Sequence, residues 1–145
     1  MIEEPDLMQS AVEELLRFDS PVQLAPRASI AEIQLAEVSI LAGQRVTLML
    51  GAANRDGERF NDPDRLNVER GPNEHLAFGF DRHFCLGALL ARVEARLAFS
   101  ISTLLRRYPG LALDGSPLQW VSNPAYRGLK ALPVNPKGLR RSIGL

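Results

Sequence analysis

The 145-residue sequence predicts an α+β fold with two main helices, short β-strands and one long irregular loop. Three observations lead to this prediction. Apolar residues recur at helical spacing in residues 7–18 and 87–107. Apolar and polar residues alternate over short stretches between residues 22 and 50. Glycine and proline interrupt residues 51–77, where no clear period is present.

The first helix is expected over residues 7–18, after the helix-opening pair Pro5-Asp6. It should end at Asp19-Ser20-Pro21, because proline disfavours helical geometry in the residue before it. Its apolar positions follow the helical period: Leu7, Ala11, Leu15 and Phe18.

Short strands are expected between residues 22 and 50. Ile33 and Leu35, and then Val38 and Ile40, carry apolar side chains with a period of two. Ala42-Gly43 predicts a turn, and the five residues that follow from Val46 to Leu50 predict a compact buried strand.

An ordered, meandering loop is expected over residues 51–77, because a loop longer than about 12–15 residues inside a compact domain is usually functional. The second main helix is expected over residues 87–107 and should stop at Pro109-Gly110. Its apolar stripe contains Leu90, Val93, Leu97, Ile101, Leu104 and Tyr108. Residues 111–134 should alternate turns with short strands.

Composition excludes several classes of function. The 17 basic and 17 acidic residues balance, so the chain lacks the basic excess of a nucleic-acid-binding protein. No apolar run approaches the roughly 20 residues that a membrane-spanning helix requires. The single cysteine excludes a disulfide framework and predicts a cytoplasmic protein. We therefore expect neither nucleic-acid nor membrane partners.

The single cysteine, Cys85, lies directly before the second predicted helix. The positive end of a helix would stabilise an anionic sulfur there. One cysteine cannot form a zinc cage, so a metal bound to it would need its remaining ligands from elsewhere, as iron in a porphyrin has. Gly87 removes a side chain where a flat group could approach. The alternative is an inert cysteine buried in an apolar pocket.

The pattern Phe78-Gly79-x-x-x-His83-x-Cys85-x-Gly87 strongly resembles the haem-binding loop of the cytochrome P450 family, the haem-thiolate monooxygenases. The resemblance runs from about residue 7 to about residue 134 and follows soluble bacterial members. The family pattern has glycine where this sequence has Asp81. Since aspartate tolerates a positive φ better than most residues, we expect an intact loop with a modified bend.

The sequence Glu14-Leu15-Leu16-Arg17 resembles the Glu-x-x-Arg pair of the same family. Spacing of i, i+3 places both side chains on one helix face, where they can share an ion-pair network. The resemblance implies a third member, an arginine from the meandering loop, and Arg65 in Asp62-Pro63-Asp64-Arg65 is the candidate. The implied role is structural. Taken alone, the pair would more often be a solvated surface pair, because this spacing occurs in many exposed helices.

The resemblance implies that Cys85 is the axial thiolate ligand of the iron of haem b. It also implies that Arg27 and His83 contact the haem propionates through charge-assisted hydrogen bonds. Outside the motif, these two side chains could be ordinary surface residues. The full set of implied haem-binding residues is Arg27, Phe78, Gly79, His83, Cys85 and Gly87.

The implied reaction is monooxygenation, in which one atom of O2 enters a small organic substrate and the other leaves as water. A thiolate ligand favours the O–O cleavage that this requires. Electrons would come from a ferredoxin or flavoprotein, which the resemblance places on the face that carries Arg82 and Arg92.

We interpret residues 1–145 as the C-terminal haem-binding portion of such an enzyme, without its N-terminal and distal part, so the substrate is not predicted. Three alternatives stay open. The chain could be a non-catalytic remnant that binds haem or a redox partner. It could be a cysteine hydrolase that pairs Cys85 with His83 or His75. It could be an interaction domain with an inert cysteine.

Overall fold

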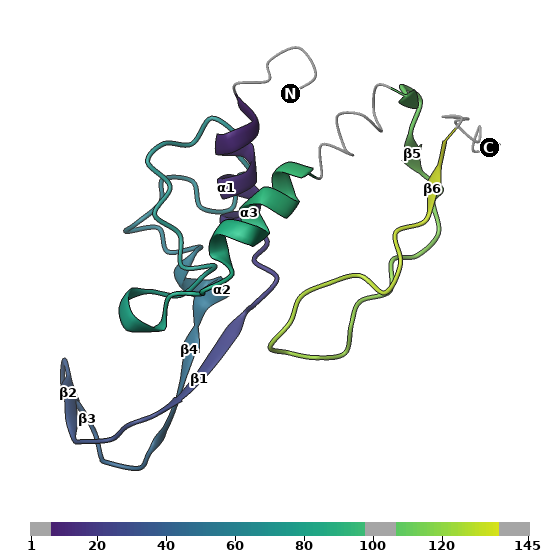
Figure 1. Cartoon of the computed structure of the whole chain (residues 1–145). Coiled ribbons are helices and arrows are strands. Elements are labelled where there is room, and N and C mark those ends of the chain that lie inside the picture. Colours follow the sequence, from purple (N-terminus) through teal and green to yellow (C-terminus); the bar gives the residue numbers. More distant parts are fainter. Residues whose placement is uncertain (1–6, 98–106, 137–145) are drawn as a thin grey trace.

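The computed structural model describes residues 7–97 and 107–136, and it confirms the predicted α+β fold (Figure 1). Within these residues, helices α1 and α3 pack against each other, and the strands form separate two-stranded ribbons. The elements, in chain order, are α1 (Met8–Phe18), β1 (Leu24–Ala28), β2 (Ile33–Leu35), β3 (Val38–Ile40), β4 (Arg45–Met49), α2 (Leu50–Ala53), the 3₁₀ helix η2 (Asp81–His83), α3 (Ala88–Leu97), β5 (Ala112–Leu113) and β6 (Val134–Asn135).

Helix α1 ends where the sequence predicted, with the backbone N–H of Asp19 donating to the carbonyl of Leu15. The predicted opening at Pro5-Asp6 lies outside the described residues. The buried face differs from the predicted one, because Leu15 is 45% exposed. The side chains that α1 buries are Ala11, Val12, Glu14 and Arg17. The helix therefore buries an ion pair beside a small apolar patch.

Strands β1 and β4 form an antiparallel ribbon in which Arg27 pairs with Val46. Strands β2 and β3 form a second, shorter ribbon at its far end (Figure 1). The predicted turn at Ala42-Gly43 is present, and Gly43 adopts a φ of +83°. The expectation of a buried strand was wrong: Leu48 and Met49 are exposed, because β4 pairs only with β1 among the described residues. Leu50 already belongs to α2.

The stretch after α2 is an ordered, meandering loop, as the sequence predicted. It runs beside α1 before it reaches η2 (Figure 1). Two of its residues, Phe60 and Ala77, are buried and extend the small apolar core. The other buried apolar residues among those described are Ala11, Val12, Leu50 and Ala88.

Helix α3 begins at Ala88, one residue later than predicted, and is described as far as Leu97. The rest of the predicted helix falls largely on residues 98–106, which lie outside the described residues. Ala88 is buried, whereas Leu90 and Val93 of the predicted apolar stripe are exposed. In the described part, the side-chain hydrogen bonds between α3 and α1 run from Arg92 to Glu13.

Residues 107–136 contact the segment that follows α1. Strands β5 and β6 pair with each other, and Trp120 forms an isolated bridge with Leu129. The N–H of Gln23 donates to the carbonyl of Ala125, at 2.9 Å. Within the described residues, no helix combines the length and the apolar character needed to cross a bilayer.

Candidate functional site

Glu14 and Arg17 form a buried ion pair on one face of α1, as their spacing predicted. The Nε of Arg17 lies 2.8 Å from Oε2 of Glu14, and its Nη2 lies 2.9 Å from Oε1. Both side chains are 0% exposed. Two charges removed from water stabilise a fold only when their remaining polar atoms are also bonded. The long loop supplies those bonds.

The third arginine of this network is Arg70 and not Arg65. The Nε of Arg70 lies 3.1 Å from Oε2 and 3.2 Å from Oε1 of Glu14. Arg65 contributes only its carbonyl oxygen, which accepts from Nη2 of Arg17 at 3.4 Å, and it is exposed. The reason is the turn at Asp62, whose φ is +47° and whose carbonyl accepts from the N–H of Arg65.

The carboxylate of Glu14 receives further hydrogen bonds from the loop. The N–H of Asn67 donates at 2.9 Å and Nδ2 of Asn73 donates at 3.0 Å. Burial by itself would raise the pKa of Glu14. The hydrogen bonds from Arg17, Asn67 and Arg70 outweigh burial and lower the pKa to about 2. Glu14 is therefore ionised at neutral pH.

Asn54 is a second buried anchor of the loop, and it was not among the predicted site residues. Its side chain donates to Oγ of Ser20 at 2.8 Å and accepts from the N–H of Leu76 at 2.7 Å. Its carbonyl accepts from Nη1 of Arg17 at 2.7 Å. The only signal in the sequence was an asparagine after a short apolar run, at the C-cap of α2.

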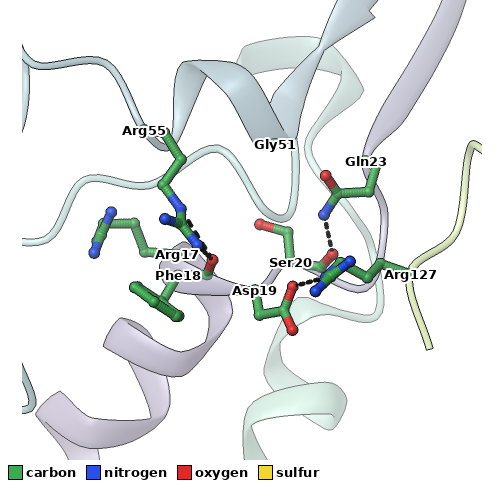
Figure 2. Close-up of a pocket in the computed structure, with 8 residues that line it drawn as sticks. All are labelled: Arg17, Phe18, Asp19, Ser20, Gln23, Gly51, Arg55 and Arg127. Atoms are coloured by element: carbon green, nitrogen blue, oxygen red, sulfur yellow. Dashed lines mark hydrogen bonds and ion pairs between the residues drawn. The ribbon is translucent and has the colours of Figure 1, made fainter. Parts of the chain in front are cut away.

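A polar cavity of about 290 Å³ lies at the end of α1 (Figure 2). Arg55 reaches across it to the carbonyl of Phe18, at 2.7 Å, and stacks 4.0 Å from the ring centroid of Phe18. Arg127 forms an ion pair with Asp19. Arg17, Arg55 and Arg127, which line this cavity, are all paired. The cavity is therefore part of the architecture that attaches the long loop and residues 107–136 to α1.

The cysteine loop forms a tight, hydrogen-bonded turn. The N–H of Cys85 donates to the carbonyl of Phe78 at 2.8 Å, and the N–H of Phe84 donates to the carbonyl of Asp81 at 2.9 Å. Gly79 has a φ of +75° and Asp81 has a φ of +52°. Asp81 thus adopts the left-handed conformation for which glycine is best suited. The loop is intact despite the aspartate.

The thiol of Cys85 is exposed, three residues before the first residue of α3. This finding contradicts the alternative of a cysteine sealed in the core. A Cβ added to Gly87 would lie 3.8 Å from Sγ of Cys85, so this glycine keeps one side of the sulfur clear. Among the described residues, no group of three or more His, Cys, Asp or Glu side chains could hold a metal ion. A metal bound by Cys85 would need a ligand set such as a macrocycle supplies.

Arg27 and His83 line the same cavity, although they are distant in sequence. Arg27 projects from β1 and His83 from η2, and the cavity between them has a volume of about 370 Å³. Gly79 and Phe80 of the cysteine loop also line it. The remaining lining residues are Ala25, Leu48, Met49, Leu50, Ala53 and Leu76. The arrangement is an apolar hollow with two potential cations beside the cysteine loop.

Glu13, His75 and Arg92 form a cluster between α1 and α3 that the sequence did not predict. Arg92 donates from Nε and Nη2 to the two carboxylate oxygens of Glu13, at 2.6 and 2.8 Å. Nε2 of His75 lies 3.0 Å from Oε2 of Glu13. The hydrogen bond from Arg92 lowers the pKa of Glu13, and burial lowers the pKa of His75. Arg92, which lies on the face where the resemblance places the electron donor, is thus paired with Glu13 within the fold.

The cluster also bears on the hydrolase alternative. Both ring nitrogens of His75 are engaged, one with Glu13 and the other with the N–H of Ala77. Among the described residues, no hydrogen bond joins the thiol of Cys85 to His75 or His83. A catalytic base must be within hydrogen-bond reach of its nucleophile, so the structure does not support a cysteine–histidine pair.

The buried ion pair of α1, the anchored loop and the cysteine turn before α3 define a partial cytochrome P450 fold. Solved structures with the same fold include P450BioI in complex with an acyl carrier protein, with a TM-score of 0.86 and 45% identity, covering 92% of this chain and 34% of that chain. CYP109E1 from Bacillus megaterium, in complex with corticosterone, has a TM-score of 0.88 and 39% identity, covering 94% and 36%.

The chain belongs to the cytochrome P450 family, whose family model matches residues 1–118. A biotin biosynthesis cytochrome P450 of Bacillus subtilis is 46% identical over 91% of this chain and 33% of that protein. The cytochrome P450 monooxygenase PikC of Streptomyces venezuelae is 49% identical over 88% of this chain and 31% of that protein. The chain thus spans about a third of the length of these relatives.

Proposed function

We propose that residues 1–145 are the C-terminal haem-binding portion of a cytochrome P450 monooxygenase, with Cys85 as the axial thiolate ligand of haem b. The observation that carries this proposal is the exposed Cys85 thiol in an ordered loop, beside a cavity that brings Arg27 and His83 together. Membership of the cytochrome P450 family supports it.

The residues present fit haem. Cys85 offers a lone sulfur with one side kept clear by Gly87. Arg27 and His83 would bind the propionates, and the hollow between them is otherwise apolar. Gly79 suits its place because its φ of +75° would strain a residue with a side chain, and an added Cβ would lie only 3.1 Å from the carbonyl oxygen of His83. Bound haem would supply the activation of O2 that monooxygenation requires.

Contacts within this chain fix the position of the Cys85 sulfur. The hydrogen bond from the N–H of Cys85 to the carbonyl of Phe78 fixes the backbone that carries the sulfur. The Glu14 network holds the long loop that leads into this turn.

The proposed reactants are O2 and a small organic substrate, with electrons from a ferredoxin or flavoprotein. Corticosterone and an acyl carrier protein accompany two of the related structures, which fits organic substrates of diverse size. The free cysteine suits a cytoplasmic setting. The second candidate is a non-catalytic remnant that binds haem or a redox partner, which would use the same cysteine loop and cavity.

The test is haem reconstitution of the purified chain and of Cys85→Ser. We expect saturable binding and, after reduction under carbon monoxide, the absorption band of thiolate ligation in the wild type. Cys85→Ser should lose that band and keep its circular dichroism spectrum. The same band in both proteins would exclude Cys85 as the ligand. Stoichiometric binding without donor-dependent O2 consumption would favour the non-catalytic candidate.

A further inference from the structure

The aromatic ring of Phe78, in the cysteine loop, is enclosed by three neighbours. The guanidinium of Arg92 lies 4.7 Å from its centroid. The ring of His75 lies 6.0 Å away and is tilted by 52°, and the ring of Phe84 lies 6.3 Å away in an edge-on arrangement. A cation over an aromatic face is attracted by the quadrupole of the ring. The position of Phe78 therefore depends on where Arg92 is held.

Glu13 determines where Arg92 is held. Its two oxygens accept a bidentate pair of hydrogen bonds from Arg92, at 2.6 and 2.8 Å, which fixes both the place and the plane of the guanidinium. The side chains of Arg92 and Glu13 are 24% and 19% exposed, so solvent screens the pair only in part. Glu13 is on α1 and Arg92 is on α3, so the pair also fixes the two helices relative to each other.

His75 orients the second oxygen of Glu13. Its Nδ1 accepts from the N–H of Ala77 at 3.2 Å, so in the neutral ring Nε2 carries the hydrogen and donates to Glu13. The His75 side chain is 2% exposed. Among the described residues, the donors to the Glu13 carboxylate are Arg92 and His75, and both of these residues also contact the ring of Phe78.

Phe78 is linked directly to the cysteine. Its carbonyl accepts from the N–H of Cys85 at 2.8 Å, and its ring meets that of Phe84, the residue before Cys85. A displacement of the Phe78 ring would therefore reach the cysteine backbone through two separate contacts.

We propose that Glu13 is a positioning residue for the cysteine loop, acting through Arg92, which it holds against the face of Phe78. The effect on a bound haem rests on the proposed function, whereas the effect on Phe78 does not. The opposite possibility is that Glu13 and Arg92 only join α1 to α3, in which case their loss would lower stability without moving the ring.

The experiment labels the phenylalanines of the full chain with fluorine and follows the Phe78 resonance by NMR, without haem. Phe78→Leu assigns the resonance. We expect Glu13→Ala and Arg92→Ala each to shift or broaden it, and the double variant to match Arg92→Ala, because Glu13 acts through Arg92. Glu13→Gln, which keeps the volume and one acceptor oxygen, should have an intermediate effect and serves if Glu13→Ala does not fold. Arg92→Lys keeps the charge without the planar fork and should restore the resonance only in part.

Arg55→Ala is the matched control, because Arg55 also stacks on a phenylalanine, Phe18, and pairs with a carboxylate, Asp64. It should leave the Phe78 resonance unchanged. An unshifted Phe78 resonance in folded Glu13→Ala, or equal shifts in the control, would overturn the proposal. With haem, the carbon monoxide band should move in Glu13→Ala and not in Arg55→Ala. A wild-type chain that shows no such band refutes the haem proposal alone, since the NMR result stands without the cofactor.

Discussion

Arg70 holds the buried carboxylate of Glu14, with its Nε 3.1 Å from Oε2, across 56 residues of sequence. The same guanidinium donates to the carbonyl of Asn61 at 2.7 Å and to that of Asp62 at 3.2 Å. The side chain of Arg70 thus joins separate parts of the long loop to one another and joins the loop to α1. The loop that leads to Cys85 is therefore held mainly by a charge network, since only Phe60 and Ala77 of this loop are buried apolar residues.

Arg70→Ala should destabilise the chain far more than Arg65→Ala. Removing Arg70 deletes charge-assisted bonds to Glu14 and three loop carbonyls, which should cost roughly 2–3 kcal/mol. Arg65 is exposed and contributes only a carbonyl oxygen, so its substitution should change stability by less than about 0.5 kcal/mol. Urea denaturation of both variants measures the difference. Equal losses would mean that Arg70 is not the third member of the network.

The pKa of Glu14 predicts how stability falls in acid. Its folded value of about 2 lies below its ordinary value of 4.5, so the unfolded chain binds the proton more tightly. The stabilisation is complete above the ordinary value and is lost as the pH falls toward the folded value. It amounts to roughly 3 kcal/mol. Denaturation curves between these two pH values should show the loss. Glu14→Gln should be less stable at neutral pH and should lack this part of the acid dependence.

The local features of this fold could be predicted from the sequence, because neighbouring residues determine them. The end of α1 at Asp19, the pairing of Glu14 with Arg17 and the tolerance of Asp81 for its bend all depend on residues within one turn. The choice of Arg70 over Arg65 depends on how a loop folds back over α1, which no local period encodes.

The cluster of Glu13, His75 and Arg92 was missed for the same reason, since its members come from three separate segments. The exposure of Leu15 and Leu48 was not predicted either. An apolar period indicates which residues can be buried, but burial itself requires a neighbouring segment to cover them. Among the described residues, none covers these two side chains.

Asp81 should tolerate glycine and reject a β-branched residue. Its φ of +52° lies in the left-handed region, where a branched Cβ is strained. Asp81→Gly should stay within about 1 kcal/mol of the wild type, whereas Asp81→Val should lose about 1–3 kcal/mol. Thermal unfolding of the two variants measures this. A stable valine variant would show that the loop reaches the same turn with another backbone conformation.

Replacing Arg27 should weaken haem binding without destabilising the fold. Its side chain lines the cavity that His83 also lines, and it donates an exposed hydrogen bond to the carbonyl of Pro26. If Arg27 binds a propionate, Arg27→Ala should weaken haem binding about 10- to 100-fold in a spectroscopic titration, the effect of losing one charge-assisted hydrogen bond. Arg82→Ala is the matched control: Arg82 is exposed, precedes His83 and does not line that cavity, so its loss should leave affinity unchanged. Equal affinities for the Arg27→Ala variant and the wild type would place the propionates elsewhere, while equal losses in both variants would indicate a general effect of positive charge.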